Sequence, residues 1–129
     1  MAIRSTNTRA RAGTRPIFRG EVWRANLAPS IGAEQNKTRP VIIVSADAIG
    51  ALPLRIVVPL TSMQAKFQNK PWFVFIPKDP HNGLSNDSAA DAFQVRSLSV
   101  DRLSVRLGVV RADQMEAITA AVAICIDHP

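Results

Sequence analysis

The chain has 129 residues, of which 47% are hydrophobic, and a mean hydropathy of +0.04. This length suffices for one compact domain with a hydrophobic core. No apolar run approaches the roughly 20 residues of a membrane-spanning helix, so none is expected. The single cysteine, Cys125, excludes an internal disulfide, and we expect a cytoplasmic protein.

The net charge of +6 is unevenly distributed along the chain. Five arginines precede the first acid, Glu21, and 11 basic residues face 10 acidic ones from Gly20 onward. The sequence therefore predicts a disordered basic N-terminal arm over residues 1–18 and a single, nearly neutral domain over residues 19–129. A second interpretation of the arm, an organellar presequence, stays open, as does weak attraction to phosphates.

Short apolar segments rich in β-branched and aromatic residues predict strands, and breakers separate them. We expect strands over residues 19–25, 40–45, 54–60, 71–77 and 107–110, and a bent strand or strand pair over residues 88–98. Pro59 marks a bulge or sheet edge. Helical turns are expected over residues 46–50, with Ser45 as a cap, and 100–103.

Residues 112–126 predict the one long helix, because Met115, Ile118, Val122 and Ile126 recur at helical spacing. Cys125 in this pattern is expected to be buried and inert. Many short strands and one C-terminal amphipathic helix favour a mainly β (α+β) fold, a small, strongly bent sheet or barrel.

The polar stretch from Gly32 to Pro40 precedes an apolar strand. Arg39 lies between a flexible loop and a fixed strand, a placement that suits recognition of an anion such as phosphate. Two plainer interpretations stay open. The stretch is a solvated loop, or Arg39 forms a weak surface ion pair with Glu34.

Metal catalysis is poorly supported, because His81 and His128 show no ligand spacing, and we expect no cofactor. Metal-free phosphate chemistry needs a cation and nearby hydroxyls, for which Arg39, Thr61 and Ser62 are the candidates. Turn or cap roles for the two hydroxyls remain an alternative. Trp23 and Trp72 are expected in the core.

From Arg19 to the C-terminus the chain resembles the MazF/PemK family of toxins from toxin–antitoxin pairs. The resemblance is carried by segments in matching order: Arg19-Gly20-Glu21-Val22-Trp23, Gly32-Ala33-Glu34-Gln35, Thr38-Arg39-Pro40-Val41, Val58-Pro59-Leu60-Thr61-Ser62, Gly83-Leu84, Asp87-Ser88 and Gln94-Val95-Arg96.

This resemblance implies an SH3-like barrel, shared with the gyrase poison CcdB, and a homodimer. It implies a sequence-specific, metal-independent endoribonuclease that cleaves single-stranded RNA (mRNA) by 2′-OH attack, leaving a 2′,3′-cyclic phosphate. A cognate MazE/PemI-like antitoxin would neutralise it by covering the RNA groove. Two alternatives stay open, a non-nucleolytic toxin of the same fold that inhibits DNA gyrase and a catalytically silent RNA-binding module.

By motif position, the resemblance implies catalytic roles for Arg39, Thr61 and Glu34. Arg39 would neutralise the transition state, Thr61 would hold the phosphate in line, and Glu34 would act as the base or orient Arg39. RNA contacts are expected at Gln35, Lys37, Ser62, Gln64, Lys66, Gln94 and Arg96.

Two positions depart from the family pattern. Phe93 stands where many members carry an acid, and Ala33 stands where some carry a histidine. Asp91 is a candidate substitute for the missing acid, because it lies two residues earlier in the predicted strand.

Overall fold

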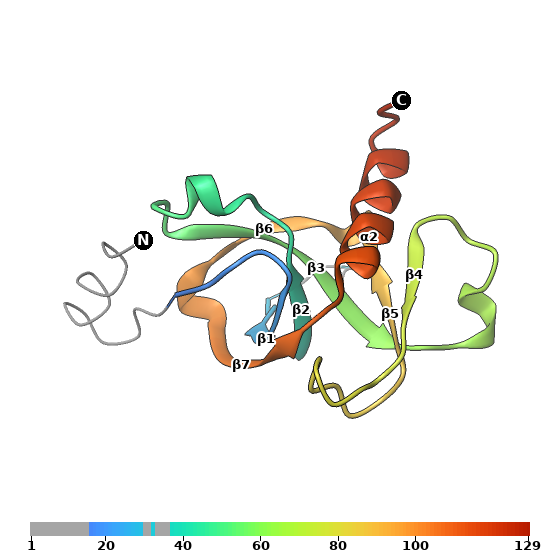
Figure 1. Ribbon diagram of the computed structural model, residues 1–129, viewed down its shortest axis with the longest axis horizontal. Coiled ribbons are helices and arrows are strands. Elements are labelled where there is room, and N and C mark those ends of the chain that lie inside the picture. Colours follow the sequence, from blue (N-terminus) through green and yellow to red (C-terminus); the bar gives the residue numbers. More distant parts are fainter. Residues whose placement is uncertain (1–15, 30–31, 33–36) are drawn as a thin grey trace.

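A computed structural model describes residues 16–29, 32 and 37–129, and it is mainly β (Figure 1). The strands are β1 (Glu21–Asn26), β2 (Thr38–Ile43), β3 (Leu54–Ser62), β4 (Phe73–Ile76), β5 (Ser88–Asp91), β6 (Arg96–Ser99) and β7 (Leu103–Val109). Four 3₁₀ turns, η1 (Asp47–Ile49), η2 (Ala65–Phe67), η3 (Ala92–Gln94) and η4 (Val100–Arg102), and the helix α2 (Ala112–Cys125) complete the described elements.

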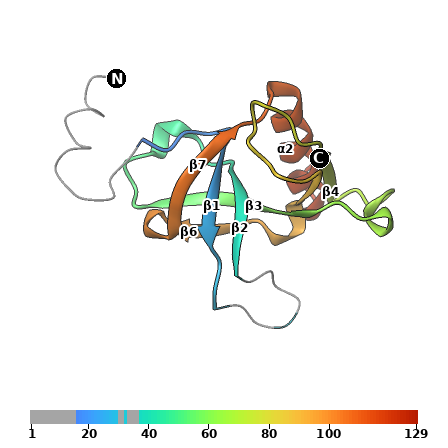
Figure 2. The same ribbon diagram turned by 90° about the horizontal axis from the view of Figure 1, so that it is seen from below.

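The strands form one antiparallel sheet in the order β4-β5-β3-β2-β1-β7, and β6 pairs with the first half of β3. In Figure 2, β7, β1 and β2 lie side by side and run across β3 and β6. No pairing joins β7 to β4 or to β6 among the described strands, so the barrel stays open. The prediction of a mainly β fold with a strongly bent sheet is confirmed.

β3 changes partner along its length, and this change explains a proline inside it. Leu54–Val57 pair with β6 and Leu60–Ser62 pair with β5, which leaves Val58 and Pro59 between the two partners. Because proline has no N–H, it costs no ladder bond on that side. Pro59 was predicted at a bulge or sheet edge. It lies instead inside a central strand, at the point where one side of β3 has no partner.

The sheet has a hydrophobic core on each face, as alternation along its central strands requires. On one face Ile42, Val58 and Leu60 pack with Met115 and Ile118 of α2. On the other face the second core comprises Ile17, Trp23, Ala25, Leu27, Val41, Ile43, Val57, Leu98 and Leu103. Both cores hold the central strands rigidly from opposite sides.

The prediction for residues 88–98 left two alternatives open, and the strand pair is the one observed, because the Asp91 carboxylate accepts the Phe93 N–H and ends β5 with a 3₁₀ turn. Two other local expectations needed correction. β7 starts four residues before the predicted strand, since pairing with β1 extends it through polar positions. The expected cap Ser45 is wrong, because Ala46 precedes η1 and Ser45 is buried.

The C-terminal end of α2 is more exposed than its apolar pattern predicts. Met115 and Ile118 are buried, but Ile126 is 67% exposed and Cys125 is half-buried. Figure 1 shows this end of α2 rising beyond the sheet. Cys125 was expected to be buried and is instead half-buried. This partial burial still raises the pKa of its thiol.

The tryptophans and the arm complete the comparison with the expected fold. Trp23 is confirmed as core, whereas Trp72 is only half-buried. Of the predicted disordered arm over residues 1–18, Ile17 packs in the second core, and residues 1–15 lie outside the described residues. None of the described helices combines the length and apolarity needed to cross a bilayer.

Candidate functional site

Arg39 and Thr61 come together where β2 and β3 stop pairing. The recorded register sets Val41 opposite Pro59, and the same antiparallel register extended by two residues sets Arg39 opposite Thr61. Both residues line one pocket of about 210 Å³. Because the strands separate there, residues from both alternating faces of β2 and β3 reach this pocket, which we call the Arg39 pocket.

The lining of the Arg39 pocket is cationic and rich in donors. It consists of Arg24, Thr38, Arg39, Pro40, Leu60, Thr61, Ser62, Gly83, Leu84, Ser85, Asn86, Ser88 and Leu107. This lining includes two guanidinium groups, five hydroxyls and an amide, and none of the described residues that line it carries a carboxylate. Arg39 Nε is buried and has no hydrogen-bond partner among the described residues. An anion with several oxygens, such as a phosphodiester, matches this set of donors.

One wall of the pocket is the turn between β4 and β5, whose backbone packs directly on β7. Gly83 has a φ of +68°, and a Cβ there would lie 2.1 Å from the Leu107 carbonyl oxygen. A Cβ on Gly108 would lie 2.1 Å from the His81 carbonyl oxygen. Only glycine permits both approaches, so these two residues fix the distance between the turn and β7.

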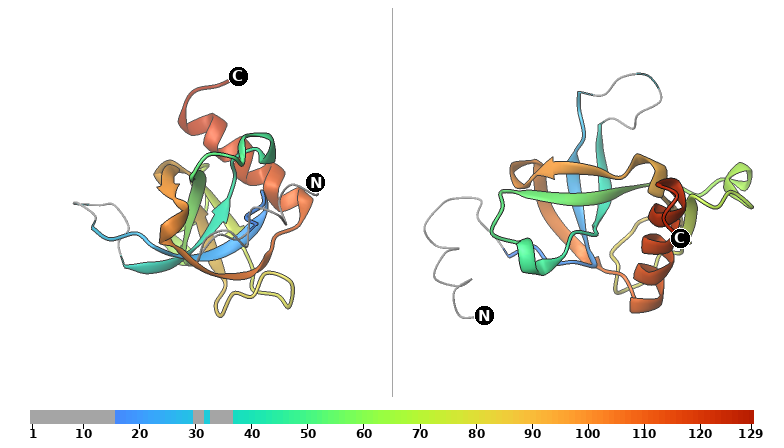
Figure 3. Two further views of the ribbon diagram at one scale, coloured as in Figure 1. Left: turned by 90° about the vertical axis from the view of Figure 1, so that its left-hand side faces the viewer. Right: turned by 90° about the horizontal axis from the view of Figure 1, so that it is seen from above.

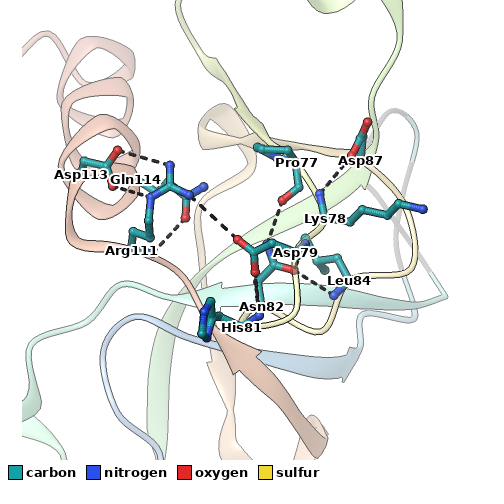
Figure 4. A network of polar contacts seen from close by, with 10 residues as sticks. All are labelled: Pro77, Lys78, Asp79, His81, Asn82, Leu84, Asp87, Arg111, Asp113 and Gln114. Carbon is teal, nitrogen blue, oxygen red and sulfur yellow. Dashed lines mark hydrogen bonds and ion pairs between the residues drawn. The ribbon is translucent and has the colours of Figure 1, made fainter.

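A buried amide holds this turn in shape (Figure 4). Asn82 is 0% exposed. Its Oδ1 accepts the N–H groups of Asp79 (3.2 Å) and Leu84 (3.0 Å), and its Nδ2 donates to the Pro77 carbonyl (2.9 Å). Asp79 also accepts the N–H of His81 at 2.8 Å. These bonds position residues 83–86, which line the pocket.

Charged contacts tie the same turn to the start of α2. The Arg111 guanidinium lies 3.9 Å from Asp79 and 3.0 Å from Asp113 (Figure 4). The hydrogen bond from Arg111 lowers the pKa of Asp113, and the bond in turn raises the pKa of Arg111. At the start of α2, the Gln114 side chain accepts the backbone N–H of Arg111 through Oε1 at 2.9 Å and so caps the first turn of the helix. The pocket wall is thereby linked to the helix that covers the first core.

Glu21, in the first of the segments that carry the resemblance, has a structural role. Glu21 is 8% exposed, and its Oε1 accepts the indole N–H of Trp23 and the backbone N–H of Phe18. Its Oε2 lies 2.9 Å from Arg106 Nε. The Glu21 carboxylate therefore links Phe18, which precedes β1, to Arg106 of β7. β7 is the edge strand against which the turn between β4 and β5 packs.

The predicted RNA contacts do not gather in the Arg39 pocket, with one exception. Ser62 lines it, whereas the described Lys37, Gln64, Lys66, Gln94 and Arg96 do not. Glu34 and Gln35 lie outside the described residues. Lys37 is exposed just before β2, Gln64 precedes η2, and Arg96 lies opposite Val57 in β6. The Gln94 side chain donates to Asp91 at 3.1 Å.

Asp91, the candidate substitute for the missing acid, is engaged in local hydrogen bonds. It is 7% exposed, and its two oxygens accept from the Phe93 N–H and the Gln94 amide. It does not line the Arg39 pocket. Phe93 itself is 70% exposed. The carboxylate is buried because it caps η3, a role that the alternating pattern of the strand did not reveal.

Sequence reasoning missed Arg24, Ser85, Asn86 and Ser88 as pocket residues. A signal for Arg24 existed, because it is an exposed cation between the buried Trp23 and Ala25. Its position opposite Pro40 required the register. Among the described residues, no group of three or more His, Cys, Asp or Glu side chains is placed to hold a metal ion.

The chain is similar in sequence to known toxins. Residues 18–126 match the family model described as PemK-like, MazF-like toxin of type II toxin-antitoxin system. Endoribonuclease MazF9 of Mycobacterium tuberculosis is 35% identical over 115 residues, which cover 84% of this chain and 95% of that protein.

Solved structures agree on the fold. MazF (Form-I) from Deinococcus radiodurans superposes with a TM-score of 0.74 at 23% identity, covering 88% of this chain and 98% of that one. A MazE-MazF structure (Form-II) from the same organism gives 0.66 at 25% identity, covering 88% and 97%. All the segments that carry the resemblance lie within the span of the family match. The chain belongs to the PemK-like, MazF-like toxin family of type II toxin–antitoxin systems.

Proposed function

We propose that this toxin is an endoribonuclease that cleaves single-stranded RNA at the Arg39 pocket. The observation that carries the proposal is that Arg39 and Thr61 line the same pocket, together with a second guanidinium and further hydroxyls. The relative named Endoribonuclease MazF9 supports it independently.

The reaction is a transesterification that needs no water in its first step. The ribose 2′-oxygen forms a bond to the adjacent phosphorus, the bond from phosphorus to the 5′-oxygen breaks, and a 2′,3′-cyclic phosphate remains. The 2′-OH proton leaves to a base, and the departing 5′-oxygen takes up a proton. Negative charge grows on the phosphate oxygens during this step.

Arg39 is proposed to bind those oxygens through its fork of N–H donors. Its buried Nε, without a partner among the described residues, is a donor that a phosphate oxygen would satisfy. Thr61 is proposed to donate its hydroxyl and hold the phosphate in line with the attacking oxygen. Arg24 adds positive charge on the same lining. Glu34 remains the proposed base or the residue that orients Arg39.

The partners follow from the family. One similar solved structure is titled an endoribonuclease in complex with its cognate antitoxin, from Mycobacterial species. We propose that a cognate MazE/PemI-like antitoxin neutralises this chain, that the toxin is a homodimer, and that it acts in the cytoplasm on mRNA at a short sequence.

The test is cleavage of a long single-stranded RNA in EDTA, with mapping of the ends. We expect discrete fragments that end in 2′,3′-cyclic phosphate. Arg39→Ala should lower the cleavage rate about 10²- to 10³-fold, the loss typical of a group that stabilises transition-state charge. Arg39→Lys should recover only part of the rate, because a point charge replaces the fork.

The matched control is Lys78→Ala, which removes an exposed cation outside the pocket lining and uses only its backbone N–H in the structure. It should cleave at the wild-type rate. Intact RNA with the wild-type protein would refute the nuclease. Gyrase inhibition in that case would favour the non-nucleolytic toxin, and RNA binding without cleavage would favour the silent module, in which Phe93 replaces the usual acid.

A further inference from the structure

A second groove adjoins the Arg39 pocket and is not used by the proposed chemistry. It has a volume of about 430 Å³ and is lined by Met63, Phe67, Gln68, Asn69, Lys70, Phe73 and Phe75, a set that we call the aromatic groove. The segment between β3 and β4 that forms much of it projects from the body beside β4 (Figure 3).

The groove presents aromatic rings in an organised stack. The Phe67 and Phe73 rings lie 4.0 Å apart at an interplanar angle of 19°. Trp72 lies 6.0 Å from Phe73. Phe75 is 51% exposed, although it belongs to a strand whose neighbour Ile76 is fully buried. A large exposed ring beside a ready stack is a surface on which another flat ring can stack.

Two cations accompany the aromatic rings of the groove. The carboxylate of Asp91, opposite Phe73 in the sheet, is 7% exposed and accepts hydrogen bonds from Phe93 and Gln94. Lys66 Nζ lies 5.8 Å from the Phe67 ring centroid, and Lys70 Nζ lies 5.6 Å from that of Trp72. No aspartate or glutamate occurs anywhere between Asp47 and Asp79 in the sequence. Neither lysine forms an ion pair among the described residues. Aromatic faces accompanied by such cations match the bases and phosphates of a single-stranded nucleic acid.

The sheet register connects the groove to the proposed scissile phosphate. Thr61 lies opposite Ala89, and Ala89 lies opposite Phe75. Residues opposite each other in a ladder share a face of the sheet, so Thr61 and Phe75 project from the same face. They are two strands apart, about 10 Å at roughly 4.8 Å per strand. At the stacked rise of about 3.4 Å per nucleotide, this distance corresponds to about three nucleotides.

We propose that the aromatic groove is a base-stacking subsite for single-stranded RNA, with Phe75 as its platform, a few nucleotides from the phosphate held by Arg39 and Thr61. This inference rests on the proposed function and extends it to the substrate beyond the cleaved bond. Ser62 lines the Arg39 pocket and Met63 lines the groove, so the two sites are continuous along the chain.

The subsite contributes affinity and little sequence discrimination. Every base has a π-face, so stacking on Phe75 accepts all four bases. The contact is remote from the breaking bond and is the same before and during the reaction. Its loss should therefore raise KM and leave kcat unchanged.

The test measures binding separately from cleavage. The probe is a fluorescein-labelled single-stranded RNA of mixed sequence, about 12 nucleotides long, within the site sizes of single-strand binders. Each ribose carries a 2′-O-methyl group, so the RNA cannot be cleaved. Fluorescence anisotropy gives the Kd for wild type, Phe75→Ala, Phe75→Trp and Ile49→Ala. The last is the matched control, an equally exposed apolar side chain outside the groove.

We expect Phe75→Ala to weaken binding about 5- to 100-fold, which corresponds to the loss of one stacked base. Phe75→Trp should bind at least as tightly as wild type, and Ile49→Ala should bind like wild type. Equal Kd values for wild type and Phe75→Ala would overturn the subsite. A change in sedimentation with Phe75→Ala but not in RNA binding would also overturn it, since the groove would then be a contact between copies.

Failure of the subsite and failure of the nuclease give different results. Weaker binding by Phe75→Ala together with no cleavage by wild type would keep the stacking subsite and refute the nuclease. Normal cleavage by wild type and an unchanged KM for Phe75→Ala on unmodified RNA would keep the nuclease and refute the subsite.

Discussion

The substitution Asn82→Ala tests whether the pocket wall depends on one buried amide. The wild-type side chain is 0% exposed and makes three hydrogen bonds, all within residues 77–84. Alanine leaves two N–H groups and one carbonyl without these partners. Each lost bond of this kind costs about 1 kcal/mol, so we expect a loss of about 3 kcal/mol in the free energy of unfolding.

Urea unfolding measures this loss, with fluorescence of the buried Trp23 as the signal. At a slope of about 2 kcal/mol per M for a chain of this size, the midpoint should fall by about 1.5 M. His81→Ala is the control, because that side chain is exposed in the same turn and the turn's bonds use only its backbone. Its midpoint should match wild type.

Cleavage provides a second measurement on the same variant. Residues 83–86 line the pocket, so in native buffer Asn82→Ala should cleave RNA more slowly at a concentration where it remains folded. A midpoint for Asn82→Ala within about 0.3 M of wild type would refute the reasoning, since a loss below about 0.6 kcal/mol is incompatible with three unsatisfied groups.

Three further predictions concern stability. Glu21→Ala should lower the free energy of unfolding, measured by urea unfolding, by about 2–4 kcal/mol, because three donors lose one buried carboxylate. A loss below about 0.5 kcal/mol would contradict that role. Gly83→Ala should lower the free energy of unfolding by about 3 kcal/mol in the same assay, because the new Cβ would lie 2.1 Å from the Leu107 carbonyl oxygen and φ is +68°. A urea midpoint equal to that of wild type would contradict the close approach. Asp113 has a folded-state pKa below its unfolded value, so its contribution is present above the unfolded pKa of about 4 and is lost as pH falls through the folded pKa. Asp113→Asn should therefore show a smaller fall in Tm below about pH 4 than wild type, and equal falls would contradict the pairing.

Local patterns in the sequence were sufficient for the element types. Apolar runs rich in β-branched residues mark β2 and β3, because both faces of these strands are buried. Helical spacing marks α2, because one face of the helix is buried. The same patterns failed at element ends. β7 was predicted too short because its polar residues hide a strand that only pairing with β1 extends.

The candidate site could be predicted only in part for a related reason. Arg39 and Thr61 were identified by residue type and by position at strand ends. Arg24 and Asn86 belong to β1 and to the turn after β4, and they join the pocket through long-range pairing and through two glycine contacts with β7. Asp91 shows the converse, a residue of suitable type whose carboxylate is committed to a local cap.

By itself, the sequence determined the order of strands and helix, the basic N-terminal excess and the presence of a cation and a hydroxyl at two strand ends. Only the tertiary structure decided that Arg39 and Thr61 line one pocket and that Phe75 lies outside the core on the same face as Thr61. The physical reason is register, because a shift of one residue moves a side chain to the other face of the sheet, and the pairing of distant strands is fixed by burial on both faces at once.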